Sequence, residues 1–226
     1  EDSRTHFGIF APGVTQLFPK GHIINIHPWE HNDVAPALAA AFSTDVPIVA
    51  LHLTRPAIEV PDREKLGIAS HLDASKGAYL IRDYDDRPHD GVVIVRGTSS
   101  TNTVVSILDE ISSKYNVKII SAISWELFDR QISDYKSSII NDQEWADSMV
   151  ITNTGLSVMK NWVSNRVVSD YSLSPDWDDR WRTGGSLEQI IDEAHLSPRW
   201  VMEAIKKFAT ERGDRLERLK REIPEN

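Results

Sequence analysis

Short apolar runs and helical patterns alternate along the first fifty residues. The β-branched run Ile23–Ile26 ends before Pro28, and a helical pattern then extends from Glu30 to Phe42. The run Ile48–Leu53 follows; its continuous apolar character predicts a strand that is buried on both faces. A strand, helix, strand order favours two parallel strands, so this region predicts a β-α-β unit.

The middle of the chain has a different pattern. Residues 57–76 are rich in charge and contain Pro61, with no sustained period over about twenty residues, which is longer than most loops inside a domain. We therefore expect an interdomain linker over 57–76, with one domain over 1–56 and a second over 77–226.

After residue 77, strands and helices alternate again. Ala78–Ile81 and Val92–Val95 are predicted strands joined by the polar turn DYDDRPHD, which suggests an antiparallel hairpin. The stretch GTSST at 97–101 leads into a predicted amphipathic helix with an apolar face formed by Val104, Val105, Leu108 and Ile111. The elements predicted next are a strand at Val117–Ile120, a short helix at Trp125–Gln131, a strand at Met149–Thr152 and a helix at Leu187–Ala194. This alternation predicts an α/β fold.

The C-terminal helices have recognisable faces and ends. In the helix at 187–194, Leu187, Ile190 and Ile191 are predicted to point inward. The next helix starts at Ser197, predicted to cap it, and Pro198, and its predicted buried stripe is Val201, Ala204, Ile205, Phe208 and Ala209. The tail DRLERLKREIPEN beyond Gly213 has little apolar content and predicts a solvated helical end without a function.

Composition narrows the classes of function. Thirty-four acidic residues against 25 basic ones give a formal net charge of -9, which argues against general nucleic-acid binding. The lack of Cys excludes disulfides, thiolate metal sites and cysteine nucleophiles. No apolar stretch approaches the roughly 20 residues that span a bilayer, so we expect no membrane contact and a cytoplasmic location. The start at Glu1 without a Met suggests part of a longer polypeptide.

Several polar groups are candidates for chemistry. His27 and His31 flank Pro28, which breaks the single helical face that a histidine metal pair needs. GTSST could cradle a phosphate at a helix N-terminus, but a strand-to-helix turn with a hydroxyl cap explains it more simply. The clusters DYDD at 83–86 and DWDD at 176–179 lack the spacing of a calcium loop and predict solvated turns. The tryptophans Trp125, Trp162, Trp177, Trp181 and Trp200 are expected to pack in a core or interface.

Four stretches, taken in order, resemble one enzyme family. VKIISAISWELFDRQISDY at 117–135, and above all SWELFDRQ, resembles the C-terminal domain of transketolases. INIHPWEHNDVAPALAAAF at 24–42 and PIVALHLTRP at 47–56 resemble the end of their pyrimidine-binding domain, and GVVIVRG at 91–97 resembles a strand and turn of their C-terminal domain. The resemblance implies a partial α/β pyrimidine-binding domain over 1–56 and a three-layer α/β/α domain with a mixed, mostly parallel sheet over 77–226.

What the resemblance implies about function is specific. Transketolases, enzymes of pentose phosphate metabolism, move two-carbon ketol units between sugar phosphates with thiamine diphosphate and Mg, and act as homodimers. The family's residues that grip and activate the cofactor precede the matching region. We therefore expect neither catalytic residues nor bound cofactor on this chain alone, and we expect the rest of a parent enzyme as its partner.

Two residues match positions that hold the substrate phosphate in that family. Arg55 matches the arginine at the end of the last pyrimidine-domain strand, and a guanidinium suits a phosphate; pairing with Asp62 or Glu64 is the alternative. His6, in Thr5-His6, resembles the Thr-His-Asp-Ser segment; an ordinary loop histidine is the alternative.

The chain also departs from the family. PGVTQLFP at 12–19 stands where Gly-Glu-Asp-Gly-Pro-Thr-His is expected, and Pro56 replaces a Gln. Asn153 stands where the family often has Glu, and Arg182 where a Phe-Gly pair usually stands. These differences put the ordinary sugar-phosphate specificity in doubt and suggest a divergent member.

Two alternatives stay open at this stage. One is a non-catalytic interaction or dimerisation module with the transketolase C-terminal fold. The other is part of an enzyme that acts on 2-oxo acids, such as the first component of pyruvate dehydrogenase or deoxyxylulose-phosphate synthase. SWELFDRQ favours transketolase over the second alternative.

Overall fold

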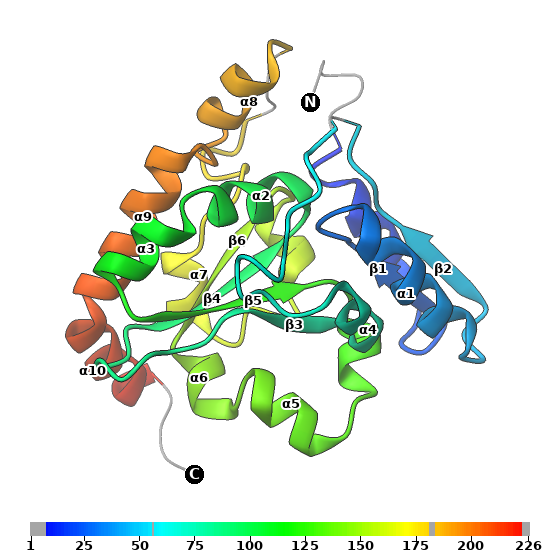
Figure 1. The fold of residues 1–226 in the computed structure, drawn as a ribbon, viewed down its shortest axis with the longest axis horizontal. Coiled ribbons are helices and arrows are strands. Elements are labelled where there is room, and N and C mark those ends of the chain that lie inside the picture. Colours follow the sequence, from blue (N-terminus) through cyan, green and yellow to red (C-terminus); the bar gives the residue numbers. More distant parts are fainter. Residues whose placement is uncertain (1–7, 56, 181–183, 223–226) are drawn as a thin grey trace.

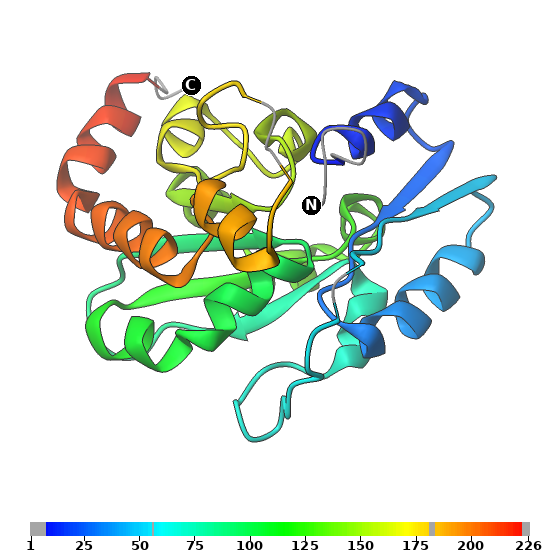
Figure 2. The ribbon, with the colours of Figure 1, turned by 90° about the horizontal axis from the view of Figure 1, so that it is seen from above.

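Two sheets organise the chain. The computed structural model describes residues 8–55, 57–180 and 184–222. A two-stranded sheet, β1-β2, lies beside a four-stranded sheet with the order β3-β5-β4-β6, as Figures 1 and 2 show. The predicted α/β class with a mixed, mostly parallel sheet is confirmed. None of the described helices is long and apolar enough to cross a membrane.

The N-terminal unit is the predicted β-α-β arrangement. After the 3-10 helix η2 (Ala11–Leu17), β1 (Ile23–Ile26), α1 (His31–Phe42) and β2 (Ile48–Leu51) follow, and β1 pairs parallel with β2. The expectation that the second strand is buried on both faces is wrong. All four β2 residues are half-buried, because β2 pairs with β1 alone among the described strands.

Part of the segment 57–76 contacts α1. The segment includes the 3-10 helix η3 (His71–Lys76), which lies against α1 and next to β3. The domain boundaries at residues 56 and 76 stay predictions.

A buried arginine from this segment holds α1 in place. Nη2 of Arg63 donates to Glu30 Oε1 and to Asp33 Oδ1, each at 2.6 Å. The other carboxylate oxygen of Asp33 accepts from the Tyr79 hydroxyl at 2.9 Å and from the Trp29 backbone N–H at 3.1 Å. The guanidinium also lies over the rings of Trp29 and Tyr79. Since Tyr79 belongs to β3, this cluster joins α1 of the N-terminal unit to the four-stranded sheet.

The four-stranded sheet is mixed. Its strands are β3 (Ala78–Arg82), β4 (Gly91–Arg96), β5 (Val117–Ala122) and β6 (Ser148–Thr152); β4 is parallel to both β5 and β6, and β3 is antiparallel to β5. The predicted hairpin between β3 and β4 is wrong, because β5 lies between them. The polar turn joins β5 instead: the backbone N–H of Asp85 donates to the Asn116 side chain at 2.9 Å, and that of Asp90 donates to the Asn116 carbonyl at 2.9 Å.

Helices cover both faces of this sheet. Val93, Val95 and Ile119 face α2 (Thr98–Ser106), α3 (Leu108–Lys114) and α9 (Pro198–Thr210). Val92 and Ile94 face the opposite layer, which is built by α4 (Trp125–Asp129), α5 (Ser133–Ile139), α6 (Asp142–Ala146), the 3-10 helix η4 (Leu156–Met159) and α7 (Arg166–Tyr171). Strand side chains alternate between two apolar cores, as expected for a covered sheet. The predicted three-layer arrangement is therefore present (Figure 1).

Local details of the helices differ from the sequence expectations. The amphipathic helix after β4 breaks at Ile107, whose φ of -117° and ψ of 18° end α2 before α3 begins. In α8 (Leu187–Glu193), Leu187 is exposed while Ile190 is buried. Ser197 precedes α9 without the predicted cap bond, and its hydroxyl donates to Asp192 at 2.6 Å instead.

The C-terminal helix is more than a solvated end. In α10 (Arg212–Glu222), Arg215 is 1% exposed and its Nε donates to Asp147 at 2.7 Å. Its guanidinium lies 3.6 Å from the centre of the Phe208 ring, and Nη2 donates to the Asp90 carbonyl at 3.0 Å. The expectation of a solvated tail is wrong, since this buried ion pair attaches α10 to the end of the sheet.

The Arg63 cluster generates a stability prediction. Arg63→Ala leaves the Glu30 and Asp33 carboxylates buried without their cation, so we expect the free energy of unfolding to fall by about 3 to 5 kcal/mol. Arg199→Ala, which removes an exposed pair with Asp192, is the matched control and should cost less than about 1 kcal/mol. Urea unfolding followed by tryptophan fluorescence measures both. Equal losses in the two variants would contradict the importance of the buried cluster.

Candidate functional site

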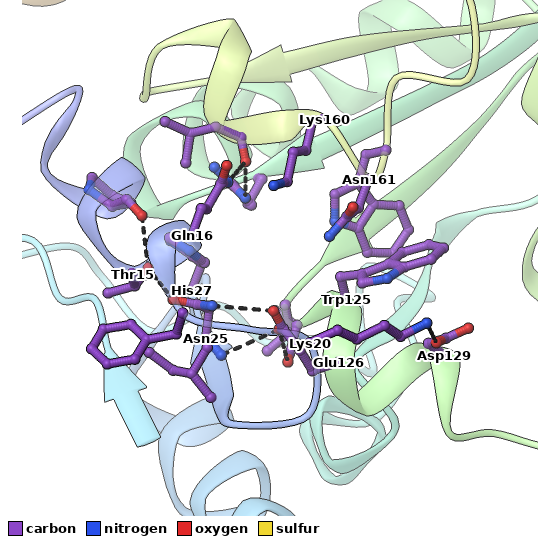
Figure 3. Close-up of a pocket in the computed structure, with 18 of the residues that line it drawn as sticks. Thr15, Gln16, Lys20, Asn25, His27, Trp125, Glu126, Asp129, Lys160 and Asn161 are labelled. Carbon is purple, nitrogen blue, oxygen red and sulfur yellow. Dashed lines mark hydrogen bonds and ion pairs between the residues drawn. The ribbon is translucent and has the colours of Figure 1, made fainter. Parts of the chain in front are cut away.

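A cavity of about 500 Å³ lies between the N-terminal unit and the four-stranded sheet. One wall comes from η2, the loop after it and β1, and the other from the end of β4, the β5-α4 turn and the segment after η4. Figure 3 shows Lys160 and Asn161 on one side of this cavity, with Asn25 and Glu126 on another. We call it the interunit cavity.

Asn25 and Glu126 connect the two walls. The backbone N–H of Asn25 donates to Glu126 Oε2 at 3.2 Å, and its side-chain amide donates to Oε1 at 3.1 Å. The side-chain oxygen Oδ1 of Asn25 accepts from the Thr15 hydroxyl, and the Ser124 hydroxyl donates to Glu126 at 3.3 Å. Both oxygens of Glu126 therefore already accept hydrogen bonds, which suits a structural bridge rather than an acid or base.

Arg96 at the end of β4 is a buried cation in the wall of the interunit cavity. It is 6% exposed; Nη2 donates to the Thr154 hydroxyl at 2.9 Å and Nη1 to the Val158 carbonyl at 3.3 Å, while Nε has no hydrogen-bond partner. Burial lowers the pKa of Arg96 to about 9, partly offset by the charge of Glu126. The side chain is therefore still cationic at neutral pH.

Two stacked histidines follow the parallel strands of the small sheet. The centres of the His27 and His52 rings are 4.2 Å apart and the ring planes are nearly parallel, and the His27 backbone N–H donates to the Ile123 carbonyl at 2.8 Å. Burial, and then the charge of Arg96, lower the pKa of His27 well below its usual value and that of His52 to about 4. Both are neutral at pH 7. His31 is exposed in the first turn of α1 and does not share their surface.

A second cavity, of about 410 Å³, lies at the carboxyl ends of strands from both sheets. His27, residues 51–54, residues 97–99 and residues 153–154 line it. β5 and β6 lie on opposite sides of β4, so the connection after β4 and the connection that leads to β6 run to opposite sides of it. Ligands of open α/β sheets commonly bind where connections diverge in this way. Gly97, at φ 92°, is required here because a side chain would collide with Asn153.

The GTSST turn has no hydroxyl cap. No side chain caps α2, and the Thr98 hydroxyl instead donates to the Pro28 carbonyl at 3.1 Å. The expected capped turn is therefore wrong, and this hydrogen bond fixes the N-terminal unit to the start of α2.

The sequence-predicted site residues are not brought together. Arg55 is exposed directly after Thr54, which lines the second cavity, but Arg55 itself does not line it. His6 lies outside the described residues. The phosphate-binding roles of both stay predictions.

The acidic clusters and tryptophans have structural contacts. Asp85 pairs with Arg82 and Arg87, and Asp176 accepts from the Leu156 backbone N–H at 3.1 Å. Within 8–55, 57–180 and 184–222, no group of three or more His, Asp or Glu side chains could hold a metal ion.

Trp162 is buried and packs edge-on against Trp125, as predicted. Trp177 is half exposed, and both Trp177 and Trp200 stack on His195. Trp181 is outside the described residues.

Sequence reasoning did not identify Arg96, Glu126 or His52 as site residues. One signal was available: the charged Arg96 ends an otherwise apolar strand beside a glycine, which is where α/β folds place functional groups. Glu126 lies inside SWELFDRQ, but nothing in that stretch indicates that Asn25 is its partner.

Comparisons with known proteins support the transketolase resemblance. No protein-family model matches the chain. The chloroplastic transketolase of Craterostigma plantagineum is 29% identical over 145 residues, 62% of this chain and 26% of that protein. The structure of Leishmania mexicana transketolase matches 93% of this chain and 28% of its own, with a TM-score of 0.73 and 17% identity.

A third match is a shorter protein. A structure described as a split-gene transketolase, inactive β4 tetramer, matches 92% of this chain and 63% of its own, with a TM-score of 0.55 and 11% identity. The chain therefore spans about a quarter of the length of the plant transketolase that it matches, and it corresponds to a C-terminal region. The predicted resemblance to transketolases is confirmed.

The histidine stack generates a pH prediction. Because the pKa values of His27 and His52 are lower in the folded chain, their contribution to stability is complete above pH 6.5 and declines as the pH falls toward 4. We expect the free energy of unfolding to fall by about 1 to 2 kcal/mol over this pH range. Each pKa unit corresponds to about 1.4 kcal/mol, and we expect less than the full pKa difference would give because His52 is partly solvated. Urea unfolding at pH 7 and at pH 4.5 measures it.

The His27→Gln/His52→Gln double variant should lose that part of the pH dependence, while the exposed-site control His31→Gln should keep it. The same pH dependence in both variants would refute the assignment.

Proposed function

We propose that this chain, which is related to transketolases over their C-terminal region, is part of a transketolase-type enzyme that transfers two-carbon ketol units between sugar phosphates. The observation that carries the proposal is the joint match: sequence similarity over 62% of the chain and fold similarity over 93% of it, both to transketolases. The relatives reported above favour sugar phosphates over 2-oxo acids as substrates.

In this proposal the cofactor is bound mainly by other parts of the enzyme. Thiamine diphosphate needs a magnesium ion for its diphosphate. Among the described residues, no group of three or more His, Asp or Glu side chains could hold a metal ion. The chain would instead supply a scaffold and one end of the substrate site.

The exposed β2 edge supports incorporation into a larger assembly. Parallel strands are almost always covered on both faces, yet the whole of β2 is half-buried, and Phe42 and Leu53 beside it are 71% and 64% exposed. We propose that further strands of the pyrimidine-binding domain, from elsewhere in the polypeptide or from another subunit, continue this sheet.

Arg55 is the proposed phosphate clamp. It follows β2 at the carboxyl end of the small sheet, beside the second cavity, which is where open α/β sheets bind ligands. A guanidinium there would present paired donors to a phosphate.

A second candidate is a non-catalytic assembly module. The support is the fold similarity to a split-gene transketolase that is described as an inactive β4 tetramer. A chain of this type would self-associate without turning over substrate, and would gain activity only with its complementary half.

The first prediction of the proposal concerns cofactor binding. Isothermal titration of the purified chain with thiamine diphosphate and Mg should show no binding, because the proposal places the cofactor-binding groups on other parts of the enzyme. Adding the cofactor-binding half in trans should restore binding and ketose-phosphate conversion. Micromolar, magnesium-dependent binding to the chain alone would contradict the proposal, and failure of every complementing half would favour the assembly module.

The second prediction concerns Arg55 in the reconstituted enzyme. Arg55→Met should raise KM for a phosphorylated ketose donor by about 10- to 100-fold, since a charge-assisted hydrogen bond contributes about 1.5 to 3 kcal/mol. A non-phosphorylated donor should be converted with unchanged KM. Arg199→Met is the matched control, and equal effects on both donors would remove Arg55 from the phosphate site.

A further inference from the structure

The interunit cavity has the opposite charge balance to the chain. Four cationic side chains, Lys20, Arg96, Arg130 and Lys160, line it, against the two carboxylates of Glu126 and Asp129. The whole chain has a formal net charge of -9. A local excess of positive charge in an acidic protein attracts anions to that place.

The carboxylates offset the positive charge only in part. Both oxygens of Glu126 accept hydrogen bonds from Asn25, and Asp129 pairs with Lys20 at 3.2 Å. Among the described residues, Arg130 and Lys160 have no ion-pair partner and Arg96 pairs with no carboxylate. Four cationic side chains against two carboxylates therefore leave the lining of the cavity with two more positive than negative charges.

Arg96 is the strongest indication that an anion belongs there. Its guanidinium is more than nine-tenths buried, and Nε has no partner. A buried cation without an opposite charge is costly, and a buried donor without an acceptor adds to that cost. His27 and His52 beside it supply no negative charge and Glu126 offsets its charge only in part, so an oxyanion in the cavity would add to the compensation of the Arg96 charge.

The remaining walls define the body of the ligand. Trp125 and Trp162 line the cavity, together with Phe18 and two prolines. A volume of about 500 Å³ is in the range of small-molecule sites. Aromatic walls beside a cationic pocket suit a molecule with an oxyanion at one end and a flat or apolar body.

We propose that the interunit cavity binds a small phosphate monoester, with its phosphate toward Arg96, Arg130 and Lys160 and its body against Trp125. A dianionic phosphate matches an excess of two positive charges better than a single carboxylate does. This site differs from the one proposed for Arg55: it lies along β1 and α4, whereas Arg55 follows β2 beside the second cavity. It requires neither thiamine diphosphate nor the rest of the enzyme.

Phenyl phosphate is the test ligand, because it joins a phosphate dianion to a flat ring. Titration of the purified chain should change tryptophan fluorescence, through Trp125, and raise Tm with a sub-millimolar to low-millimolar Kd. Inorganic phosphate should bind more weakly and phenol should not bind. Equal binding of inorganic and phenyl phosphate would overturn the role of the aromatic wall.

The variants separate this site from general anion binding. Arg130→Gln/Lys160→Gln removes two exposed cations of the cavity and should weaken phenyl phosphate binding at least about tenfold, because each of these cations would donate a charge-assisted hydrogen bond to the phosphate. Lys65→Gln/Arg199→Gln removes two exposed cations elsewhere and should leave Kd unchanged. Equal Kd values in the two double variants, or no binding by the unaltered chain at about 10 mM ligand, would overturn the proposal.

Arg96→Met provides a further check where circular dichroism shows that it folds. It should abolish binding, and retained affinity in a folded Arg96→Met chain would overturn the role of Arg96. The double variant at Arg130 and Lys160 tests phosphate binding in the interunit cavity without relying on the folding of Arg96→Met, because both side chains are exposed and their substitution leaves the core intact.

Discussion

The placement of the N-terminal unit depends on one buried guanidinium. Arg63 lies between the Glu30 and Asp33 carboxylates at the start of α1, and Asp33 in turn accepts from Tyr79 of the second sheet. A charge cluster of this kind is stable only when all of its partners are present, since each becomes a buried, unpaired group without the others. It therefore sets one relative position of the two sheets rather than a range of positions. Both cavities lie along the resulting junction and share His27, so their shapes depend on that position.

The elements were predictable where local pattern decides them. β1, β5 and β6 are β-branched runs, and α1 and α9 have clear apolar stripes, so hydrophobic periodicity was sufficient. Strand pairing was not predictable in the same way. β3 and β4 look like hairpin partners because they are close in sequence, but β5 is inserted between them by the crossover through α2 and α3. Arg215 escaped prediction for a similar reason: its partner Asp147 is 68 residues away, and a charge-rich tail gives no local sign of burial.

The candidate site residues also divide into those that the sequence identifies and those that depend on contacts between distant parts of the chain. Arg55 was identified because a family resemblance extends to the end of β2, not because of any feature of its surroundings. The sequence did not identify Arg96, Asn25, Glu126 or His52, because these residues are distinguished by their neighbours in the folded chain. Asn25 and Glu126 are 101 residues apart and meet only after the two sheets have packed together. A charged residue that ends an apolar strand was the one available sign, and it applies to Arg96 alone.

The distribution of charge connects the fold to its proposed roles. An acidic surface keeps the chain away from polyanions, while low-dielectric walls at the junction concentrate the field of the few cations placed there. Arg96 is the clearest case, because burial makes its charge both costly and effective: the same desolvation that lowers its pKa strengthens any interaction with an anion that enters. Such a group persists in a core only where the surrounding structure compensates for it. Glu126 compensates for the Arg96 charge in part. The Arg63 cluster contributes indirectly, since it fixes the N-terminal unit that forms one wall of the cavity in which the proposed anion would bind.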